Sequence, residues 1–221
     1  MNILDIVGPV MVGPSSSHTA GAVKIGLISR KLLGEKVVEA KLYMHGSFLA
    51  TGKGHGTDKA LVAGLMGMKV DDIRIPHSFE IAGEEGLNFE FYPIELIEAH
   101  PNSVKMQLKG ETGKQLDIIA ASIGGGRVKI CEIDGLTANF EGNYPTLVVH
   151  NQDQPGHVLS ITAMLAHRSI NIASMQLFRD SRGGYAVMVI ECDHEIPKES
   201  IEWLRKQEGI LKVTYLSQEE V

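Results

Sequence analysis

The sequence has few cysteines, and this scarcity excludes several kinds of site. Its 221 residues include only two, Cys131 and Cys192. An iron–sulfur cluster or a structural zinc ion held by one chain normally needs three or four thiolate or imidazole ligands at short spacings. Two isolated cysteines in strand-like apolar segments are more consistent with buried thiols in a cytosolic protein than with a disulfide. We therefore expect this chain to bind no metal by itself.

Basic clusters and long apolar runs are also missing. The formal net charge is −6 and no run is rich in lysine or arginine, which argues against nucleic acid as a partner. No apolar stretch approaches the roughly 20 residues of a membrane span. The opening residues, MNILDIVGPV, contain an aspartate and no basic region, so they do not read as a secretory signal. These features indicate a globular cytoplasmic protein that contacts neither membrane nor nucleic acid.

The first 140 residues predict a mixed α/β domain. Helical spacing covers residues 19–33, and Gly34 is a natural end for that helix. A glycine-rich loop at residues 51–58 leads into a second helix, for which Thr57 or Asp58 can act as the cap. The remaining segments alternate as strands do, and residues 103–110 and 114–126 are expected to form a hairpin. The expected strands are 36–47, 71–78, 87–96, 103–110, 114–126 and 127–135.

Beyond these strands the pattern changes. Residues 137–146 are polar, rich in turn formers and contain a proline, so we expect a domain boundary there, with domains at 1–140 and 146–221. The second domain reads strand, helix, strand, strand, helix, strand. This βαββαβ order is the ferredoxin-like unit. The predicted fold class is therefore α+β.

Residues 13–21, GPSSSHTAG, place four hydroxyls and one imidazole just before a helix. One interpretation is a helix start with surplus capping residues, for which Ser17 is the natural cap. The other is an anion-binding turn, in which free backbone N–H groups and hydroxyls hold a carboxylate or phosphate. His18 adds a group that exchanges a proton near neutral pH.

Two more glycine-rich turns occur in the same domain, TGKGHGTD at residues 51–58 and SIGGG at residues 122–126. The first is not a dinucleotide fingerprint, because its third glycine comes one residue early. Each turn alone is consistent with an ordinary loop, although successive glycines can also form a nest for an anion. Together with two histidines and a lysine, these turns suggest a site for a small anionic molecule such as an amino acid.

The strings GPSSSHTAG, GSFLATGKGHGTD and SIGGG, in this order, resemble the beta domain of the iron–sulfur L-serine dehydratases. The whole chain is similar to the separate beta subunit of two-chain bacterial forms. Its C-terminal unit, with DQPG, INIASMQL and GYAVMVIE, resembles an ACT domain like that of bacterial phosphoglycerate dehydrogenases. The first domain also resembles an allosteric substrate-binding module that some of those dehydrogenases carry.

The resemblance implies a reaction, a cofactor and a partner. The reaction is elimination of water from L-serine, which gives pyruvate and ammonia. The implied cofactor is a [4Fe–4S] cluster whose cysteine ligands lie in an alpha chain, with none bound by this chain alone. His55 is the candidate base, and the loop that holds His18 lines the same cleft. The residues expected to bind L-serine are Ser15, Ser16, Ser17, Thr19, Lys53, Gly54, Thr57, Gly124 and Gly125.

Two classes of function stay open at this point. In the first, the chain is half of an enzyme and contributes residues to a site shared with the alpha chain. In the second, it is a purely regulatory module that binds serine without catalytic residues. A pyridoxal-phosphate enzyme finds no support, because the lysines stand in no recognisable cofactor motif.

The ACT domain is expected to mediate a homodimer and, as a separate expectation, to bind an amino-acid effector. Asn151, Gly156 and Asn171 fall at or next to the positions that bind serine in the dehydrogenases. The sequence departs from that family, since Asn151 replaces a histidine and Asp153 would repel a carboxylate. The alternative is a dimerisation module without a ligand.

Overall fold

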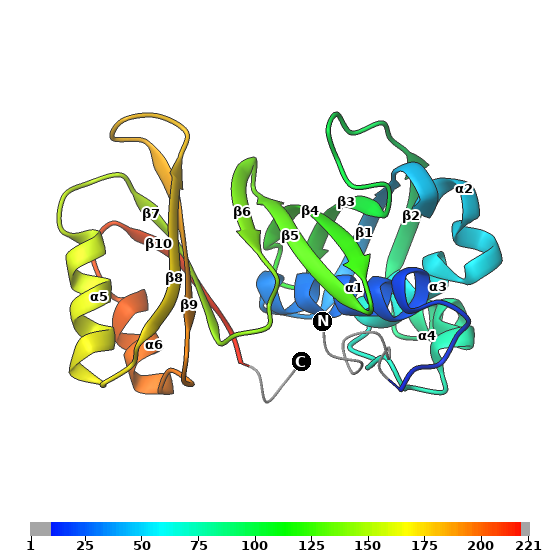
Figure 1. Cartoon of the computed structure of the whole chain (residues 1–221), viewed down its shortest axis with the longest axis horizontal. Coiled ribbons are helices and arrows are strands. Elements are labelled where there is room, and N and C mark those ends of the chain that lie inside the picture. The colour runs from blue at the N-terminus through cyan, green and yellow to red at the C-terminus, as the bar shows by residue number, and fades with distance from the viewer. Residues whose placement is uncertain (1–9, 218–221) are drawn as a thin grey trace. The chain divides into compact units, whose positions relative to one another are not determined.

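The computed structural model describes residues 10–217 and divides into two compact units, Met1–Gly135 and Leu136–Val221 (Figure 1). Each unit has its own sheet and helices. The opening residues 1–9, for which we expected no secretory signal, lie outside the described range. Within that range no helix is both long and apolar enough to cross a membrane.

The first unit contains a sheet whose strands follow the order β2-β1-β3-β4-β5. Strands β1 and β2 run parallel, and the other neighbours run antiparallel. Along β3 buried residues alternate with more exposed ones, so one face of the sheet is covered and the other is open. The strands are β1 Val37–Met44, β2 Asn88–Pro93, β3 Ser103–Gly110, β4 Gln115–Gly124 and β5 Arg127–Ile133.

Helices α1 (Gly21–Leu33) and α3 (Thr57–Leu65) lie along the covered face and cross each other closely (Figure 1). At the crossing, a Cβ on Gly64 would lie 2.1 Å from the Val23 carbonyl oxygen, and a Cβ on Gly26 would lie 2.4 Å from that of Leu61. Real side chains do not fit at such distances, so the two backbones meet at this crossing only because both positions are glycine. The expected end of the first helix is confirmed, since Gly34 adopts the left-handed conformation with φ 78°.

Helix α2 (Gly46–His55) corrects the expected loop at residues 51–58. Those residues complete a helix, and only Gly56, with φ 69°, separates α2 from α3. The expected cap at Thr57 or Asp58 is also wrong, because Gly56 is the N-cap of α3 and no side chain bonds there. Tertiary contact holds the start of α2, where the Ser47 amide donates to the Pro101 carbonyl at 2.7 Å.

The strand expected at residues 71–78 is wrong as well. The segment forms a turn, a short 3₁₀ helix (Ile75–His77) and the start of helix α4 (Ser78–Glu84). The Asp72 carboxylate accepts a hydrogen bond from the Arg74 amide at 2.9 Å, which stabilises the turn. Pro76 has no amide hydrogen to offer a neighbouring strand. Local turn chemistry therefore outweighs the apolar residues of this segment.

The second unit begins with β6 (Leu136–Phe140), in the segment that we expected to be a turn-rich linker. Its Asn139 side chain donates to Gln176 Oε1 at 3.2 Å, and Gln176 donates back to the Asn139 carbonyl at 2.9 Å. A strand thus occupies residues that turn formers dominate in sequence.

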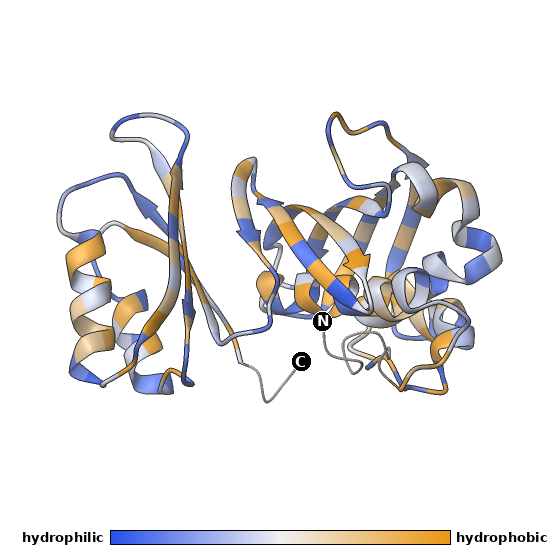
Figure 2. Ribbon diagram, viewed as in Figure 1, coloured by the Kyte–Doolittle hydropathy of each residue, from blue (hydrophilic) through white to orange (hydrophobic). Residues whose placement is uncertain are grey.

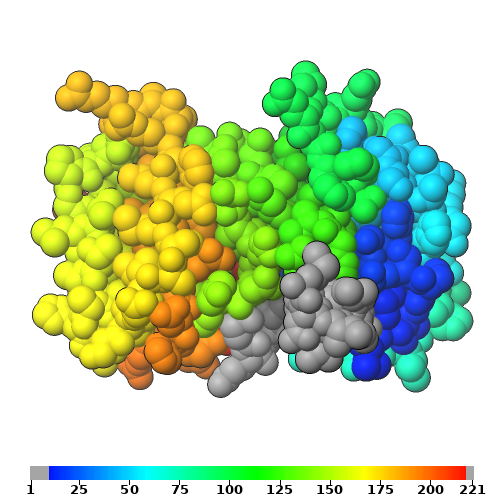
Figure 3. Space-filling view, viewed as in Figure 1, coloured from blue at the N-terminus to red at the C-terminus, as the bar shows by residue number. Residues whose placement is uncertain are grey.

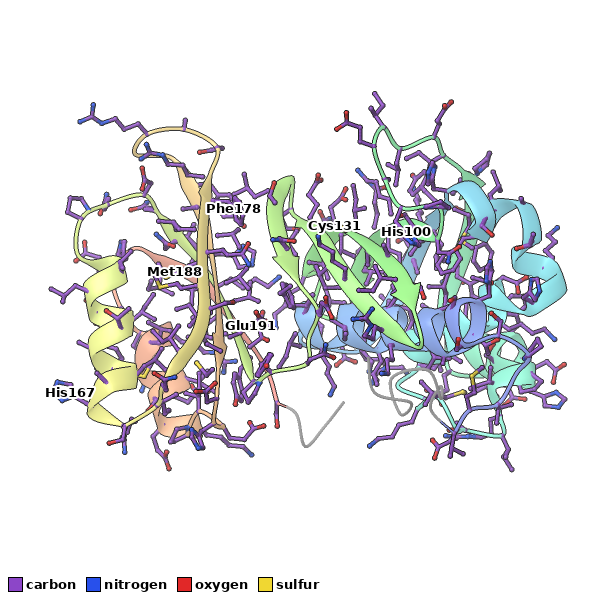
Figure 4. The ribbon with its side chains drawn as sticks, viewed as in Figure 1. His100, Cys131, His167, Phe178, Met188 and Glu191 are labelled. Atoms are coloured by element: carbon purple, nitrogen blue, oxygen red, sulfur yellow. The ribbon has the colours of Figure 1, made fainter. Side chains whose placement is uncertain are left out.

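The rest of the second unit confirms the ferredoxin-like βαββαβ prediction. Its antiparallel sheet has the order β10-β7-β9-β8, and both helices contribute to the core on one of its faces (Figures 1 and 2). Met188, labelled in Figure 4, belongs to this core together with Leu147, Leu165 and Leu204. The elements are β7 Thr146–Gln152, α5 His157–His167, β8 Ile172–Arg179, β9 Tyr185–Cys192, α6 Lys198–Arg205 and β10 Ile210–Leu216.

Candidate functional site

The serine-rich segment forms a π-helical turn, Ser16–Ala20, that leads directly into α1. Ser15 is its N-cap, and the Ser15 hydroxyl accepts a hydrogen bond from the His18 amide at 3.1 Å. The expected cap at Ser17 is therefore wrong, and the capping role belongs to Ser15. A π-helical turn is rare and occurs often at functional sites. Ser16 and Ser17 are half-buried, and their hydroxyls make no hydrogen bond to the part of the chain that the structure describes.

Helix α2 provides the surroundings of the His18 ring. The Ser47 hydroxyl lies 3.0 Å from His18 Nε2, and the Thr51 hydroxyl lies 3.1 Å from the same nitrogen. The Phe48 ring packs edge-on against the imidazole, with centroids 5.4 Å apart. These contacts hold His18 in one orientation over the helix.

His55 is the last residue of α2 and lies beside His18. The two ring centroids are 4.9 Å apart. His55 Nδ1 is 3.2 Å from the Thr51 carbonyl oxygen, and the buried Thr19 hydroxyl donates to the His55 carbonyl at 3.3 Å. Partial burial and the neighbouring His55 together lower the pKa of His18, so a second positive charge at this pair is disfavoured.

A pocket of about 320 Å³ lies between the turn that precedes α1 and the junction of α2 with α3. His55, Lys53 and Gly54 line it from one side, and Asp58 adds a carboxylate. Because Gly54 has open space where a Cβ would be, its backbone is accessible to a ligand. The full lining is Val12, Gly13, Pro14, Thr19, Lys53, Gly54, His55, Gly56, Asp58, Lys59, Ile75 and Pro76.

The structure brings some of the predicted residues together and separates others. Thr19, Lys53, Gly54 and His55 line the pocket, and His18 lies beside His55. The pocket lining does not include Ser15, Ser16 or Ser17.

Other predicted residues of the first unit lie differently. Thr57 is fully buried next to Gly52, and its hydroxyl faces the protein interior. Gly124 and Gly125 form the turn between β4 and β5, with φ 97° and 62°. From that segment it is Ser122 that reaches the start of α1, where a Cβ on Gly21 would lie 2.1 Å from its hydroxyl oxygen.

Sequence reasoning missed Ser47 and Thr51, the two hydroxyls that contact His18. A signal for them exists, because Ser47, Thr51 and His55 are spaced four residues apart and share one face of a helix. That signal is visible only if the segment is recognised as helical. Figure 3 shows that α2 lies at the surface of the molecule, and along it only Phe48 and Gly52 are buried.

The predicted effector residues of the second unit do not meet within one copy of the chain. Asn151 pairs with Ala186 at one end of the sheet, whereas Asn171 precedes Ile172, which pairs with Cys192 at the other end. Asn171 donates to the Asp193 carboxylate at 2.6 Å. Gly156, with φ 107°, stands directly before α5.

Asp153, which we expected to repel a carboxylate, is paired with a cation. Its carboxylate accepts from Arg179 at 2.6 Å and from the Gly183 amide at 3.0 Å. These contacts hold its pKa below the usual value. The positive partner offsets the repulsion that the sequence suggested.

The donor set of this chain does not fit an iron–sulfur cluster. Cys131 lies on β5 of the first unit (Figure 4), and Cys192 lies on β9 of the second. Burial raises the pKa of both thiols, that of Cys192 to about 11, which disfavours the thiolate that binds iron. Among residues 10–217, no three histidine, cysteine, aspartate or glutamate side chains gather closely enough to hold a metal ion.

Two protein-family descriptions match different parts of the chain. Residues 2–84 match the family "Serine dehydratase beta chain", and residues 145–209 match the family "ACT domain". A "Probable L-serine dehydratase, beta chain" of Bacillus subtilis (strain 168) is 38% identical over 216 residues, which cover 98% of each chain. The "L-serine dehydratase, beta chain" of Peptoniphilus asaccharolyticus is 39% identical over 190 residues, 86% of each chain.

A more distant relative is the D-3-phosphoglycerate dehydrogenase of Archaeoglobus fulgidus, 27% identical over 88% of this chain and 37% of the dehydrogenase. The two beta chains match at higher identity and over nearly their full length. The predicted resemblance is thereby confirmed, and the chain belongs to the family of L-serine dehydratase beta chains, with a C-terminal ACT domain.

Proposed function

We propose that this chain forms one half of an L-serine dehydratase site and that a separate alpha chain supplies the other half. The observation that carries the proposal is the meeting of His18, Thr19 and His55, since Thr19 and His55 line one pocket and the His18 ring lies beside His55. These residues come from two segments that are far apart in the sequence. A segment that only capped a helix would not need these residues from distant parts of the sequence to meet.

The pocket offers complementary groups to a small amino acid. Lys53 on the pocket wall supplies a donor for the substrate carboxylate, and Ser16 and Ser17, which lie outside the lining in the turn just before Thr19, are proposed to add hydroxyl donors. Asp58 offers a negative charge for the ammonium group. His55 takes the α-proton as the general base, and His18 orients the substrate beside it.

The [4Fe–4S] cluster of the holoenzyme belongs, in this proposal, to the alpha chain. The thiols of this chain are isolated and have raised pKa values, so no step of the reaction is assigned to them. The contribution of this chain is to bind the amino acid, to exclude water around it and to accept a proton at His55.

Co-expression with candidate alpha chains, followed by an anaerobic pyruvate-release assay, tests the proposal. The complex is expected to release pyruvate from L-serine, whereas this chain alone is expected to be colourless and inactive. A brown preparation of this chain alone that dehydrates serine after treatment with iron and sulfide would overturn it.

The second unit carries a regulatory proposal of its own. Asn151 is 3% exposed, and its Oδ1 has no hydrogen-bond partner among the described residues. Such an oxygen is suited to the polar groups of an amino acid, and Gly156 stands five residues later in the chain, directly before α5. We propose that the ACT domain joins two copies of the chain and binds an amino acid at their joint, where Asn171 of the second copy can approach Asn151.

Two measurements test this regulatory proposal. Sedimentation of a truncated chain ending near Pro145 is expected to show loss of the dimer, and an unchanged dimer would reject the first part. Calorimetric titration of the full chain with L-serine, repeated on Asn151→Ala, is expected to lose one binding event in the variant. Identical titrations would reject the second part. Altered cooperativity with retained turnover would support the regulatory reading over the catalytic one.

A further inference from the structure

One residue of α2, Thr51, contacts both histidines of the candidate site. Its hydroxyl oxygen is 3.1 Å from His18 Nε2, and its carbonyl oxygen is 3.2 Å from His55 Nδ1. Thr51 stands outside the groups that bind substrate in the proposed function. Its position one helical turn before His55 explains how one residue reaches both rings.

The contact with His55 determines which ring nitrogen of His55 carries the proton. A backbone carbonyl oxygen accepts hydrogen bonds and donates none. His55 Nδ1 therefore carries the hydrogen that it donates to Thr51. In the neutral ring the lone pair is then on Nε2, which becomes the proton-accepting nitrogen.

The contact with His18 has the opposite polarity. The Thr51 hydroxyl has a single hydrogen, which it donates to the Ser47 carbonyl at 2.9 Å. Towards His18 Nε2 the Thr51 oxygen must then act as an acceptor. The Ser47 hydroxyl, 3.0 Å from the same nitrogen, can accept as well. His18 Nε2 therefore carries hydrogen, and its lone pair is on Nδ1.

We propose that Thr51 is a positioning residue that holds His18 and His55 in opposite tautomers, so that Nε2 of His55 is the nitrogen that accepts the proton. The use of this nitrogen in catalysis rests on the proposed function, whereas the tautomers follow from the contacts alone. Other polar groups around the pair are the Ser47 hydroxyl on α2 and the buried Thr19 hydroxyl, which bonds to the His55 backbone. The charged groups that line the adjoining pocket are Lys53, Asp58 and Lys59.

Hydroxyl acceptors at His18 Nε2 also favour its charged form, because the imidazolium donates a stronger hydrogen bond. A hydrogen bond to the Ser47 backbone acts in the same direction and raises the His18 pKa, whereas partial burial and His55 lower it. Removal of the Thr51 hydroxyl should therefore lower that pKa further. Val has nearly the shape of Thr, so Thr51→Val removes the hydroxyl and leaves the carbonyl in place.

Nitrogen-15 NMR of the imidazole rings in the labelled full-length chain tests the proposal. His18→Gln and His55→Gln identify the two sets of signals. We expect a protonated Nδ1 and an unprotonated Nε2 in neutral His55, and the reverse in neutral His18. A lone pair on His55 Nδ1 would overturn the assignment, and this measurement on the unmodified chain does not depend on any variant of Thr51.

The variants give a second readout. Thr51→Val is expected to lower the titration midpoint of His18 and to reduce kcat of the alpha–beta complex about tenfold with little change in KM, a fraction of what a positioned base contributes. Thr51→Ser restores the hydroxyl and should restore both. An unchanged His18 midpoint in Thr51→Val would overturn the role of Thr51. If the tautomers are as expected but the complex dehydrates no serine, the proposed function is rejected and the positioning role of Thr51 stands.

Discussion

His18 and His55 of the first unit and His150 of the second unit lie in opposite environments. In the first, His55 is exposed and His18 is half-buried, and the pair lies at the edge of an open pocket. In the second, His150 on β7 is 2% exposed and forms a hydrogen bond with the Tyr185 hydroxyl through Nδ1. Burial, with a smaller effect from Lys212, lowers the His150 pKa to about 4.

The difference shows that the size of a pKa shift does not by itself locate chemistry. Perturbed groups are enriched at functional sites, but structural groups are perturbed too. The larger shift here belongs to a buried imidazole that remains neutral within a folded domain. His18 and His55 instead combine hydrogen-bonded orientation of both rings with a pocket that His55 lines.

The units also differ in how their helices pack. In the first, α1 and α3 meet backbone to backbone at Gly26 and Gly64. In the second, α5 and α6 pack on the sheet through apolar side chains such as Ile161 and Leu204. Close backbone contact tolerates no added atom, whereas a side-chain core of this kind tolerates changes that preserve volume.

The first prediction concerns the activity of a His55 variant and has the largest expected effect. His55→Ala should reduce kcat of the alpha–beta complex by about 10²- to 10⁴-fold, the usual contribution of a positioned base. Assembly of the complex should change little, because the His55 side chain is exposed. The matched control is His77→Ala, an exposed histidine outside the glycine-rich motifs. Near-normal turnover in His55→Ala would reject its role as the base.

The second prediction tests the glycine contact of the first unit. Gly64→Ala should lower the free energy of unfolding by about 3 kcal/mol, because its Cβ would lie 2.1 Å from the Val23 carbonyl oxygen. Gly83→Ala on α4 is the control, since a Cβ there meets nothing within 4 Å. It should raise stability by about 0.5 kcal/mol through the lower flexibility of the unfolded chain. Urea unfolding measures both changes, and equal effects would contradict the packing argument.

The third prediction uses the pH dependence of the second unit. The unfolded chain protonates His150 at its ordinary pKa of about 6.5, whereas the folded chain does so only near 4. Between these values the unfolded state binds more protons, so stability falls as the pH falls through this window. The expected loss from pH 7 to pH 5 is about 2 kcal/mol.

His150→Gln removes the titrating ring and should flatten that dependence, which urea unfolding at the two pH values measures. His77→Ala should leave it unchanged, because that ring is exposed in the folded state as well. If the original chain and His150→Gln lose the same stability between pH 7 and pH 5, other groups cause the loss.

The smallest expected effect separates capping from binding in the serine cluster. Ser15→Ala should lower stability by about 1 kcal/mol, because Ser15 caps the π-helical turn. Ser17→Ala should leave the melting temperature nearly unchanged and raise KM for L-serine by about tenfold through the loss of a donor to the carboxylate. Thermal melts and kinetics on the same two variants distinguish the roles. A loss of stability in Ser17→Ala with unchanged KM would return the cap to that residue.

Much of the second unit was readable from sequence because its signals are local. Apolar alternation in strands, a proline before α6 and glycines at its turns give the βαββαβ order directly. The same holds for the β3–β4 hairpin and for the end of α1 at Gly34. In each case the residues that determine the conformation are neighbours in the chain.

The motifs and the resemblance predicted that His55 and the loop of His18 share a cleft, but not the contacts that orient the two rings. Helix α2 contains Gly46, Gly52 and Gly54, which carry low helix propensity, so the sequence predicted a loop. Contact of its first turn with Pro101 and burial of Phe48 stabilise the helix instead. These contacts exist only in the folded chain.

Tertiary structure alone therefore decided the details of the site. Only the folded chain places Ser47 and Thr51 against His18, Ser15 at the cap and Thr57 in the interior. The sequence determined which residue types are available and where the chain turns, because those depend on neighbours. Which side chains meet across the site depends on the packing of helices distant in sequence, and the backbone contact of α1 with α3 establishes that packing.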